Sequence, residues 1–111
     1  MSDIRLEETP FEIDGKTYML HCNMNVLADV QEEFNGNFAE ALSERNTLKS
    51  SLVFLAAMLN DYADDMGWPE RFTAKQLGRK YKRFDLPVEK IMGVVIRAVT
   101  PDGEQTEEQG N

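Results

Sequence analysis

The sequence predicts an α+β fold in which an N-terminal β-hairpin packs on a cluster of four to five α-helices. Two alternating apolar runs flank an Asp-Gly pair, apolar residues then recur at helical spacing, and the last ten residues have no apolar side chain. A length of 111 residues is typical of one domain. We therefore expect a single α+β domain over residues 1–101 and a disordered acidic tail over residues 102–111.

The hairpin is predicted by the segment FEIDGKTYML, residues 11–20. Asp14-Gly15 suits a two-residue type I′ turn, in which both central residues take positive φ. Alternate side chains of the two strands then meet on one apolar face, which we expect to be buried. The sequence leaves open whether residues 1–9 join the sheet. The expected buried face consists of Phe11, Ile13, Tyr18, Leu20 and Cys22.

The period of the apolar residues becomes helical after residue 22. Asn23 or Asn25 can cap the first helix, and Gly36 suits the left-handed residue beyond its end. The segment NFAEALSER then predicts one or two further helical turns. The positions expected to face inward are Met24, Leu27, Val30, Phe34, Phe38 and Leu42.

Residues 47–66, TLKSSLVFLAAMLNDYADDM, give the clearest helical pattern. Additional apolar residues widen the surface beyond one stripe, so this helix should be central and contacted on more than one side. Gly67 and Pro69 end it. The repeating stripe is Leu48, Leu52, Leu55, Leu59, Tyr62 and Met66, widened by Val53, Phe54, Ala57 and Met58.

The segment RFTAKQLGRKYKRF, residues 71–84, has six basic residues and no acidic one. Thr73 and Gln76 predict a capping box at the start of a helix over residues 73–84. Pro87 then precedes a last apolar helix that continues to about Val99. In the basic helix we expect Leu77, Tyr81 and Phe84 to face inward, opposite Lys75, Arg79, Lys82 and Arg83.

Charge is distributed unevenly along a chain of net charge −8. Residues 1–65 have 13 acidic and 4 basic side chains, whereas residues 66–101 have 3 acidic and 8 basic ones. The longest apolar run, Leu52–Leu59, is far shorter than the ~20 residues of a membrane-spanning helix. With one cysteine and no apolar leader, the sequence favours a soluble protein of a reducing compartment without membrane contact.

Catalytic and metal-binding patterns are weak in this sequence. His21 and Cys22 are adjacent in a predicted strand, so they point to opposite faces and are poorly placed to share a metal or act as base and nucleophile. Asp61, Asp64 and Asp65 lie at a helix end, where carboxylates are unfavourable unless a basic group offsets them. We expect the segment 71–84 to supply that group, and we predict no catalytic, metal or cofactor site.

The basic helix permits two interpretations. It resembles a recognition helix for nucleic acid, but the preceding helix ends in acids that would face phosphates. A solvated face, or one that meets carboxylates of this chain or of a partner, is the favoured interpretation. Trp68 either packs its loop onto the core or forms an interface hot spot. The candidate partner-binding residues are Trp68, Arg71, Lys75, Arg79, Lys82 and Arg83.

The segment FEIDGKTYMLHCNMNVLADVQEEF resembles the opening of small tail assembly chaperones encoded by long-tailed phages and prophages. In that family a hairpin with a Gly–x–x–Tyr–x–Leu pattern precedes a helix ending in Glu-Glu-Phe-Gly; here Asn35-Gly36 replaces the direct glycine. The resemblance covers residues 10–100, although 79–83 is more basic than the family pattern. Matching positions are Phe11, Ile13, Gly15, Tyr18 and Leu20, then Asn25, Leu27, Glu32, Glu33 and Phe34, and the helical segments 52–59, 73–79 and 88–99.

The resemblance implies a non-enzymatic chaperone that binds the helical tape measure protein and keeps it soluble for tail tube assembly. The tail tube protein is a second expected partner, and no nucleic acid partner is expected. The implied location is the bacterial host cytoplasm and not the mature virion. Two alternatives remain, a small nucleic-acid-binding regulator that uses helix 73–84 and a virion connector that forms a ring. The sequence does not determine the oligomeric state.

Overall fold

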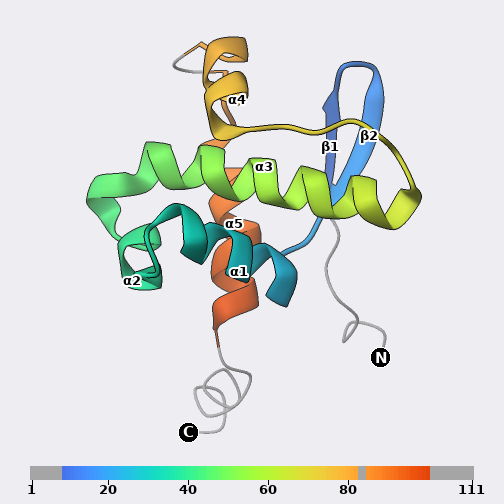
Figure 1. The fold of residues 1–111 in the computed structure, drawn as a ribbon. Coiled ribbons are helices and arrows are strands. Elements are labelled where there is room, and N and C mark those ends of the chain that lie inside the picture. Colours follow the sequence, from blue (N-terminus) through green and yellow to red (C-terminus); the bar gives the residue numbers. More distant parts are fainter. Residues whose placement is uncertain (1–8, 83–84, 101–111) are drawn as a thin grey trace, which may run out of the picture.

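A long central helix organises the fold, and the other elements pack around it (Figure 1). The computed structural model describes residues 9–82 and 85–100. Over these residues, an antiparallel hairpin and a set of helices form the expected α+β fold. Its elements are β1 (Thr9–Ile13), β2 (Lys16–Leu20), α1 (Met24–Glu33), α2 (Phe38–Ala41), a 3-10 turn (Glu44–Asn46), α3 (Thr47–Met66), α4 (Ala74–Lys80) and α5 (Val88–Val99).

The hairpin has the predicted turn and register. Asp14 and Gly15 take φ values of 53° and 79°, as a type I′ turn requires. Phe11 pairs with Tyr18 across the two strands. The predicted face is confirmed as buried at four positions and half-buried at Cys22; the buried side chains are Phe11, Ile13, Tyr18 and Leu20.

The first helix, α1, begins and ends as predicted and buries Val30 and Phe34 as expected, but one predicted inward position is exposed. Asn23 caps it by accepting a hydrogen bond from the Val26 N–H at 3.0 Å. The prediction that Met24 faces inward is wrong, because its side chain is 75% exposed while Val26 and Val30 are fully buried. Met24 lies about 200° around the helix axis from Val26, whose face is the one that contacts α3.

The segment that follows forms the short helical turns that the pattern predicted, α2 and the 3-10 turn after it. Phe38 packs its ring edge-on against Phe54, with ring centroids 6.3 Å apart. The prediction that Leu42 faces inward is wrong, because its side chain is 40% exposed. Since α2 ends at Ala41, the helical spacing that would align Leu42 with Phe38 does not continue.

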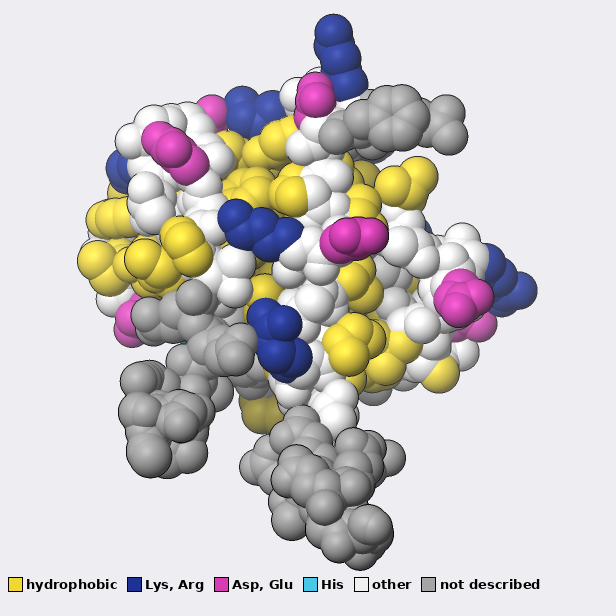
Figure 2. Space-filling view, turned by 180° about the vertical axis from the view of Figure 1, so that it is seen from behind, with side chains coloured by type: hydrophobic (Ala, Val, Ile, Leu, Met, Phe, Trp, Pro, Cys, Tyr) yellow, Lys and Arg dark blue, Asp and Glu magenta, His cyan; other side chains and the backbone are white. Residues whose placement is uncertain are grey.

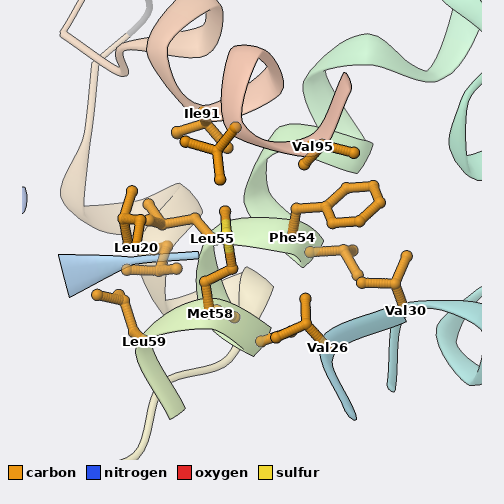
Figure 3. Close-up of a cluster of buried hydrophobic side chains, with 14 of the residues drawn as sticks. Leu20, Val26, Val30, Phe54, Leu55, Met58, Leu59, Ile91 and Val95 are labelled. Carbon is orange, nitrogen blue, oxygen red and sulfur yellow. The ribbon is translucent and has the colours of Figure 1, made fainter. Parts of the chain in front are cut away.

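The core surrounds α3, which contacts α1, α4, α5 and β2 as its broad apolar surface predicted. Phe54, Leu55 and Met58 point toward different neighbours, with Ile91 and Val95 of α5 on one side and Val26 and Val30 of α1 on the other (Figure 3). The predicted stripe is wrong at its two ends, because Leu48 and Met66 are 62% and 47% exposed. Gly67, with φ of 76°, ends the helix.

The basic helix is shorter than predicted, because α4 ends at Lys80 and not at residue 84. Its capping box is confirmed: the Gln76 N–H donates to Thr73 Oγ1 and the Thr73 N–H donates to Gln76 Oε1. Tyr81 is extended, with ψ of 139°, and its ring packs against Phe11. Lys80 pairs with Asp14 at 2.9 Å, so tertiary contacts with the hairpin replace the last helical turn.

Some predictions concern residues outside the described ranges. These include the strand pairing of residues 1–8, the side chains of Arg83 and Phe84, and the acidic tail over residues 102–111. They stay predictions. Among the described residues, no helix combines the length and the apolar character needed to cross a membrane.

Candidate polypeptide-binding groove

A surface hollow of about 430 Å³ lies between α1, α3 and α4, and we call it the groove. In Figure 1, α1 and α4 lie on opposite sides of α3, so they form its two walls. The floor is supplied by α3. The lining residues are Asp29, Glu32 and Glu33 on the α1 wall, Val53, Ala56, Ala57 and Asn60 on α3, and Phe72, Thr73, Ala74 and Lys75 on the opposite wall.

The floor of the groove is apolar and made of small side chains. Ala56 and Ala57 are 7% and 6% exposed, and Val53 beside them is 4% exposed. Short side chains at these positions leave a depression between the flanking helices, because they do not fill the space that a leucine or phenylalanine would occupy. A partner helix could therefore approach the α3 backbone closely here.

The α1 wall of the groove is acidic. Asp29, Glu32 and Glu33 follow an i, i+3, i+4 spacing, so they share one face of the helix. All three side chains are exposed. Over the described residues, no lysine or arginine lies within ion-pair distance of any of them. Their charge is thus available to a partner.

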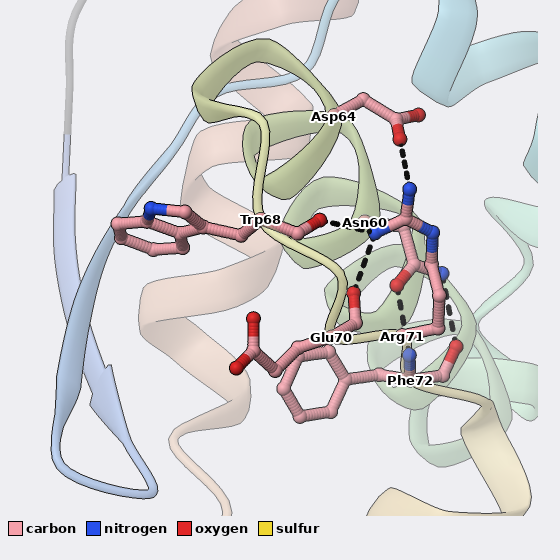
Figure 4. Close-up of polar contacts among 6 residues, drawn as sticks. All are labelled: Asn60, Asp64, Trp68, Glu70, Arg71 and Phe72. Atoms are coloured by element: carbon pink, nitrogen blue, oxygen red, sulfur yellow. Dashed lines mark hydrogen bonds and ion pairs between the residues drawn. The ribbon is translucent and has the colours of Figure 1, made fainter.

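The opposite wall is held against α3 by the segment 67–73, which we call the strap. The Asn60 side chain accepts from the Phe72 N–H at 2.8 Å and donates to the Phe72 carbonyl at 2.9 Å. Arg71 donates to the carbonyls of Trp68 and Glu70 and pairs with Asp64 (Figure 4). Hydrogen bonds therefore hold the strap through the backbone of Phe72 and through the side chain of Arg71. This wall is already formed without a partner.

Trp68 packs the strap onto the hairpin. Its ring lies edge-on to Tyr18 at 5.2 Å and to Tyr62 at 5.7 Å, measured between ring centroids. The Lys16 ammonium lies 4.3 Å from the Trp68 ring centroid and also pairs with Glu70 at 3.0 Å. The packing interpretation of this tryptophan is therefore confirmed, while a contact with a partner stays a prediction.

The candidate residues that the structure describes do not form one site, and Arg83 lies outside the described residues. Lys75 lines the groove, Arg71 pairs with Asp64, and Trp68 packs on the hairpin. Arg79 and Lys82 are exposed, and no ion pair of either is present among the described residues. Sequence reasoning missed the α1 acids and the alanine floor, although the spacing of Asp29, Glu32 and Glu33 was a readable signal.

Several basic side chains meet carboxylates of this same chain. Arg71 pairs with Asp64, which confirms that a basic group offsets the acidic end of α3. The hydrogen bond from Lys80 to Asp14 raises the pKa of the lysine above its usual range. The favoured interpretation of the basic segment included pairing with carboxylates of this chain. That pairing is confirmed for these two residues.

The polar residues at the base of the hairpin form a structural cluster. Asp61 accepts a hydrogen bond from the Asn23 side chain at 2.7 Å and lies 3.9 Å from His21 Nε2. Burial raises the pKa of the Cys22 thiol to about 11, so little thiolate exists at neutral pH. Among the described residues, no group of three or more His, Cys, Asp or Glu side chains is arranged to hold a metal ion.

The face over α5, opposite the groove, also exposes apolar side chains, interspersed with basic and acidic ones (Figure 2). Ile96 is 50% exposed there, and Met92 is half-buried. Comparison with protein-family models, with curated proteins and with solved structures found no match for the chain.

Proposed function

We propose that the chain is a non-enzymatic tail assembly chaperone that binds a phage tape measure protein and keeps it soluble while the tail tube assembles. The structural observation that supports this proposal is the groove, which offers an apolar floor to a helical polypeptide. The assignment to tail assembly rests on the resemblance of residues 10–100 to that family. The tail tube protein is a second proposed partner, and the bacterial cytoplasm is the proposed location.

The physical chemistry of the chain suits this role. A long helical client with an exposed apolar stripe aggregates unless the stripe is covered. A bound domain covers part of that stripe and adds a net charge of −8, so the complexes repel one another. Covering requires no reaction, because the benefit comes from removing apolar surface from water.

Coexpression tests the proposal. A phage tape measure protein would be expressed alone and together with this chain. We expect the soluble yield of the tape measure protein to rise severalfold and the two proteins to co-purify. An unchanged yield with no co-purification would contradict the proposed function.

One observation favours a second candidate, a nucleic-acid-binding regulator. Lys75, Arg79 and Lys82 are exposed and have no ion pair among the described residues. A mobility-shift assay at low salt tests it, because phosphate contacts give an affinity that falls steeply with added salt.

The connector alternative predicts a ring that persists at micromolar concentration, which a mass measurement in solution detects.

A further inference from the structure

We infer that the groove selects a partner helix whose apolar stripe is edged by lysine or arginine, with the cationic edge against α1. This inference deepens the proposed function and rests on it for the role of the client. The partner chemistry itself is argued from the side chains that line the groove.

The first step is the shape of the groove. Its floor of Ala56, Ala57 and Val53 is apolar and shallow, so a partner contributes the larger side chains. An amphipathic helix presents such side chains at i, i+3 or i+4 and i+7. The partner stripe therefore consists of leucine-sized residues that fill a hollow of about 430 Å³.

The second step is the charge of the α1 wall. A partner that covers Asp29, Glu32 and Glu33 removes water from their carboxylates, which is unfavourable unless opposite charges replace that water. The three carboxylates have no cation of this chain within ion-pair distance over the described residues. A lysine or arginine edge supplies the missing charges, whereas a purely apolar or acidic edge does not.

The third step is the rigidity of the other wall. The two hydrogen bonds between Asn60 and the Phe72 backbone fix the strap before a partner arrives. Binding then costs little ordering of the groove itself. Lys75 lies on this wall, so an acidic residue on the second edge of the partner helix adds a further favourable pair.

A separate polypeptide is the occupant that we infer, because α4 of a second copy does not fit the groove; α5 of a second copy, which exposes Ile96, is tested by the dimer outcome below. The basic helix α4 has only seven residues, and its apolar residue Leu77 is 1% exposed. Another copy therefore offers positive charge on α4 without an apolar stripe beside it. The groove requires both features on one helix.

Peptide binding tests the inference. Two fluorescent amphipathic peptides would share one leucine stripe and differ in having lysine or glutamate along its edges. Fluorescence anisotropy with the full chain at low salt should show about tenfold tighter binding of the lysine peptide. The reason is that the few surface ion pairs with the α1 wall together change the dissociation constant by about that factor. Raising the salt to about 1 M should largely remove the difference, because the Debye length falls to ~3 Å.

Matched charge variants locate the effect. The double variant E32K/E33K should lose the preference for the lysine peptide. The double variant E12K/D65K changes the net charge equally at exposed sites outside the groove and should retain the preference. Equal behaviour of the two variants would overturn the inference, because the selection would then come from overall charge.

A steric pair gives an independent readout. Ala74→Trp places a large side chain on the groove wall, whereas Ala39→Trp places it on an exposed position of α2. We expect only Ala74→Trp to weaken peptide binding, with both variants retaining the circular dichroism of the parent chain. If neither variant weakens binding, peptides bind elsewhere and the inference fails.

The outcome for a native client is separable from the outcome for the peptides. Selective peptide binding without rescue of a tape measure protein would support the groove and contradict the proposed function. Rescue that E32K/E33K leaves unchanged would support the function and overturn the inference. A dimer that E32K/E33K disrupts and that lysine peptides do not displace would make a second copy the occupant and also overturn it.

Discussion

The hairpin end of α3 and the groove along α3 are built from side chains of different size. Around Tyr18, the rings of Tyr62, Trp68 and Phe72 lie with centroids 5.2–6.0 Å away, and Tyr18 is 1% exposed. Along the groove, the same helix presents Ala56 and Ala57 between two walls that do not meet. Large rings therefore close the surface at the hairpin, whereas short side chains leave it open at the groove.

The comparison shows how one helix can serve both stability and binding. Aromatic side chains bury much surface and interlock in edge-on contacts, so the hairpin end contributes strongly to folding. The groove floor contributes less, because Ala56 and Ala57, although only 7% and 6% exposed, have small side chains that bury less area than the rings. We accordingly expect mutations to be most destabilising at the hairpin end and milder toward the groove.

The largest expected effect follows from Tyr18→Ala, which would break the closed region. Removing a fully buried ring leaves a cavity and should lower the free energy of unfolding by about 3–5 kcal/mol. Urea denaturation followed by circular dichroism measures this change. Thr17→Ala, on the exposed face of the same strand, is the control and should stay within about 0.5 kcal/mol of the parent.

Asn60→Ala tests the junction between the two regions. The variant leaves the N–H and carbonyl of Phe72 without their side-chain partner, at an expected cost of about 1–3 kcal/mol. Hydrogen exchange of the Phe72 amide should accelerate at the same time, because the strap loosens. Asn25→Ala, at an exposed position of α1, should change neither quantity; an unchanged Phe72 exchange rate in Asn60→Ala would contradict the role of the strap.

Thr73→Ala tests the start of the groove wall. Loss of the cap should lower the free energy of unfolding by about 1 kcal/mol, because the Gln76 N–H loses its acceptor. Urea denaturation measures it. Thr73→Ser keeps a hydroxyl acceptor and should restore most of the stability, so equal losses in the two variants would argue against capping as the cause.

Cys22 has no expected effect on stability near neutral pH, and its effects are on reactivity and on stability at high pH. Since burial raises the pKa of its thiol from 9.0 to about 11, alkylation at pH 8 should be much slower than in the urea-unfolded chain. The unfolded state loses its proton first as the pH rises, so the contribution of Cys22 to stability declines between pH 9 and pH 11. Cys22→Ser should remove that part of the decline, which urea midpoints across this range would show.

Much of the fold was predictable because its signals are local. The Asp14-Gly15 turn depends on two residues that tolerate positive φ, and the capping box depends on Thr73 and Gln76 alone. The limits of α3 were likewise predictable from its continuous apolar pattern and from Gly67. Each of these features is decided by interactions between residues close in the chain.

The predictions from the sequence were wrong where contacts between residues distant in the chain determine the structure. Met24 and Val26 are both apolar and both suit a helix, but only the approach of α1 to α3 determines which is covered. The early end of α4 coincides with the Lys80–Asp14 pair and the Tyr81–Phe11 ring contact, which join residues far apart in the sequence. Helix propensity alone does not contain this information.

The candidate site was the least predictable feature. The basic residues stood out in the sequence, yet of those that the structure describes only Lys75 lines the groove. The groove joins acids from α1, alanines from α3 and the strap, and none of these segments is unusual by itself. Its hollow follows from small residues facing a gap between helices, which is a property of their arrangement.

The sequence by itself determined the hairpin, the order of the helices, their caps and the uneven charge, because these depend on local backbone preferences and side-chain period. Only the tertiary structure decided which helix faces are covered, where α4 stops and that an acidic wall borders an apolar floor. The physical reason is that burial and charge neighbourhood are set by residues distant in the chain, whose approach no local pattern specifies.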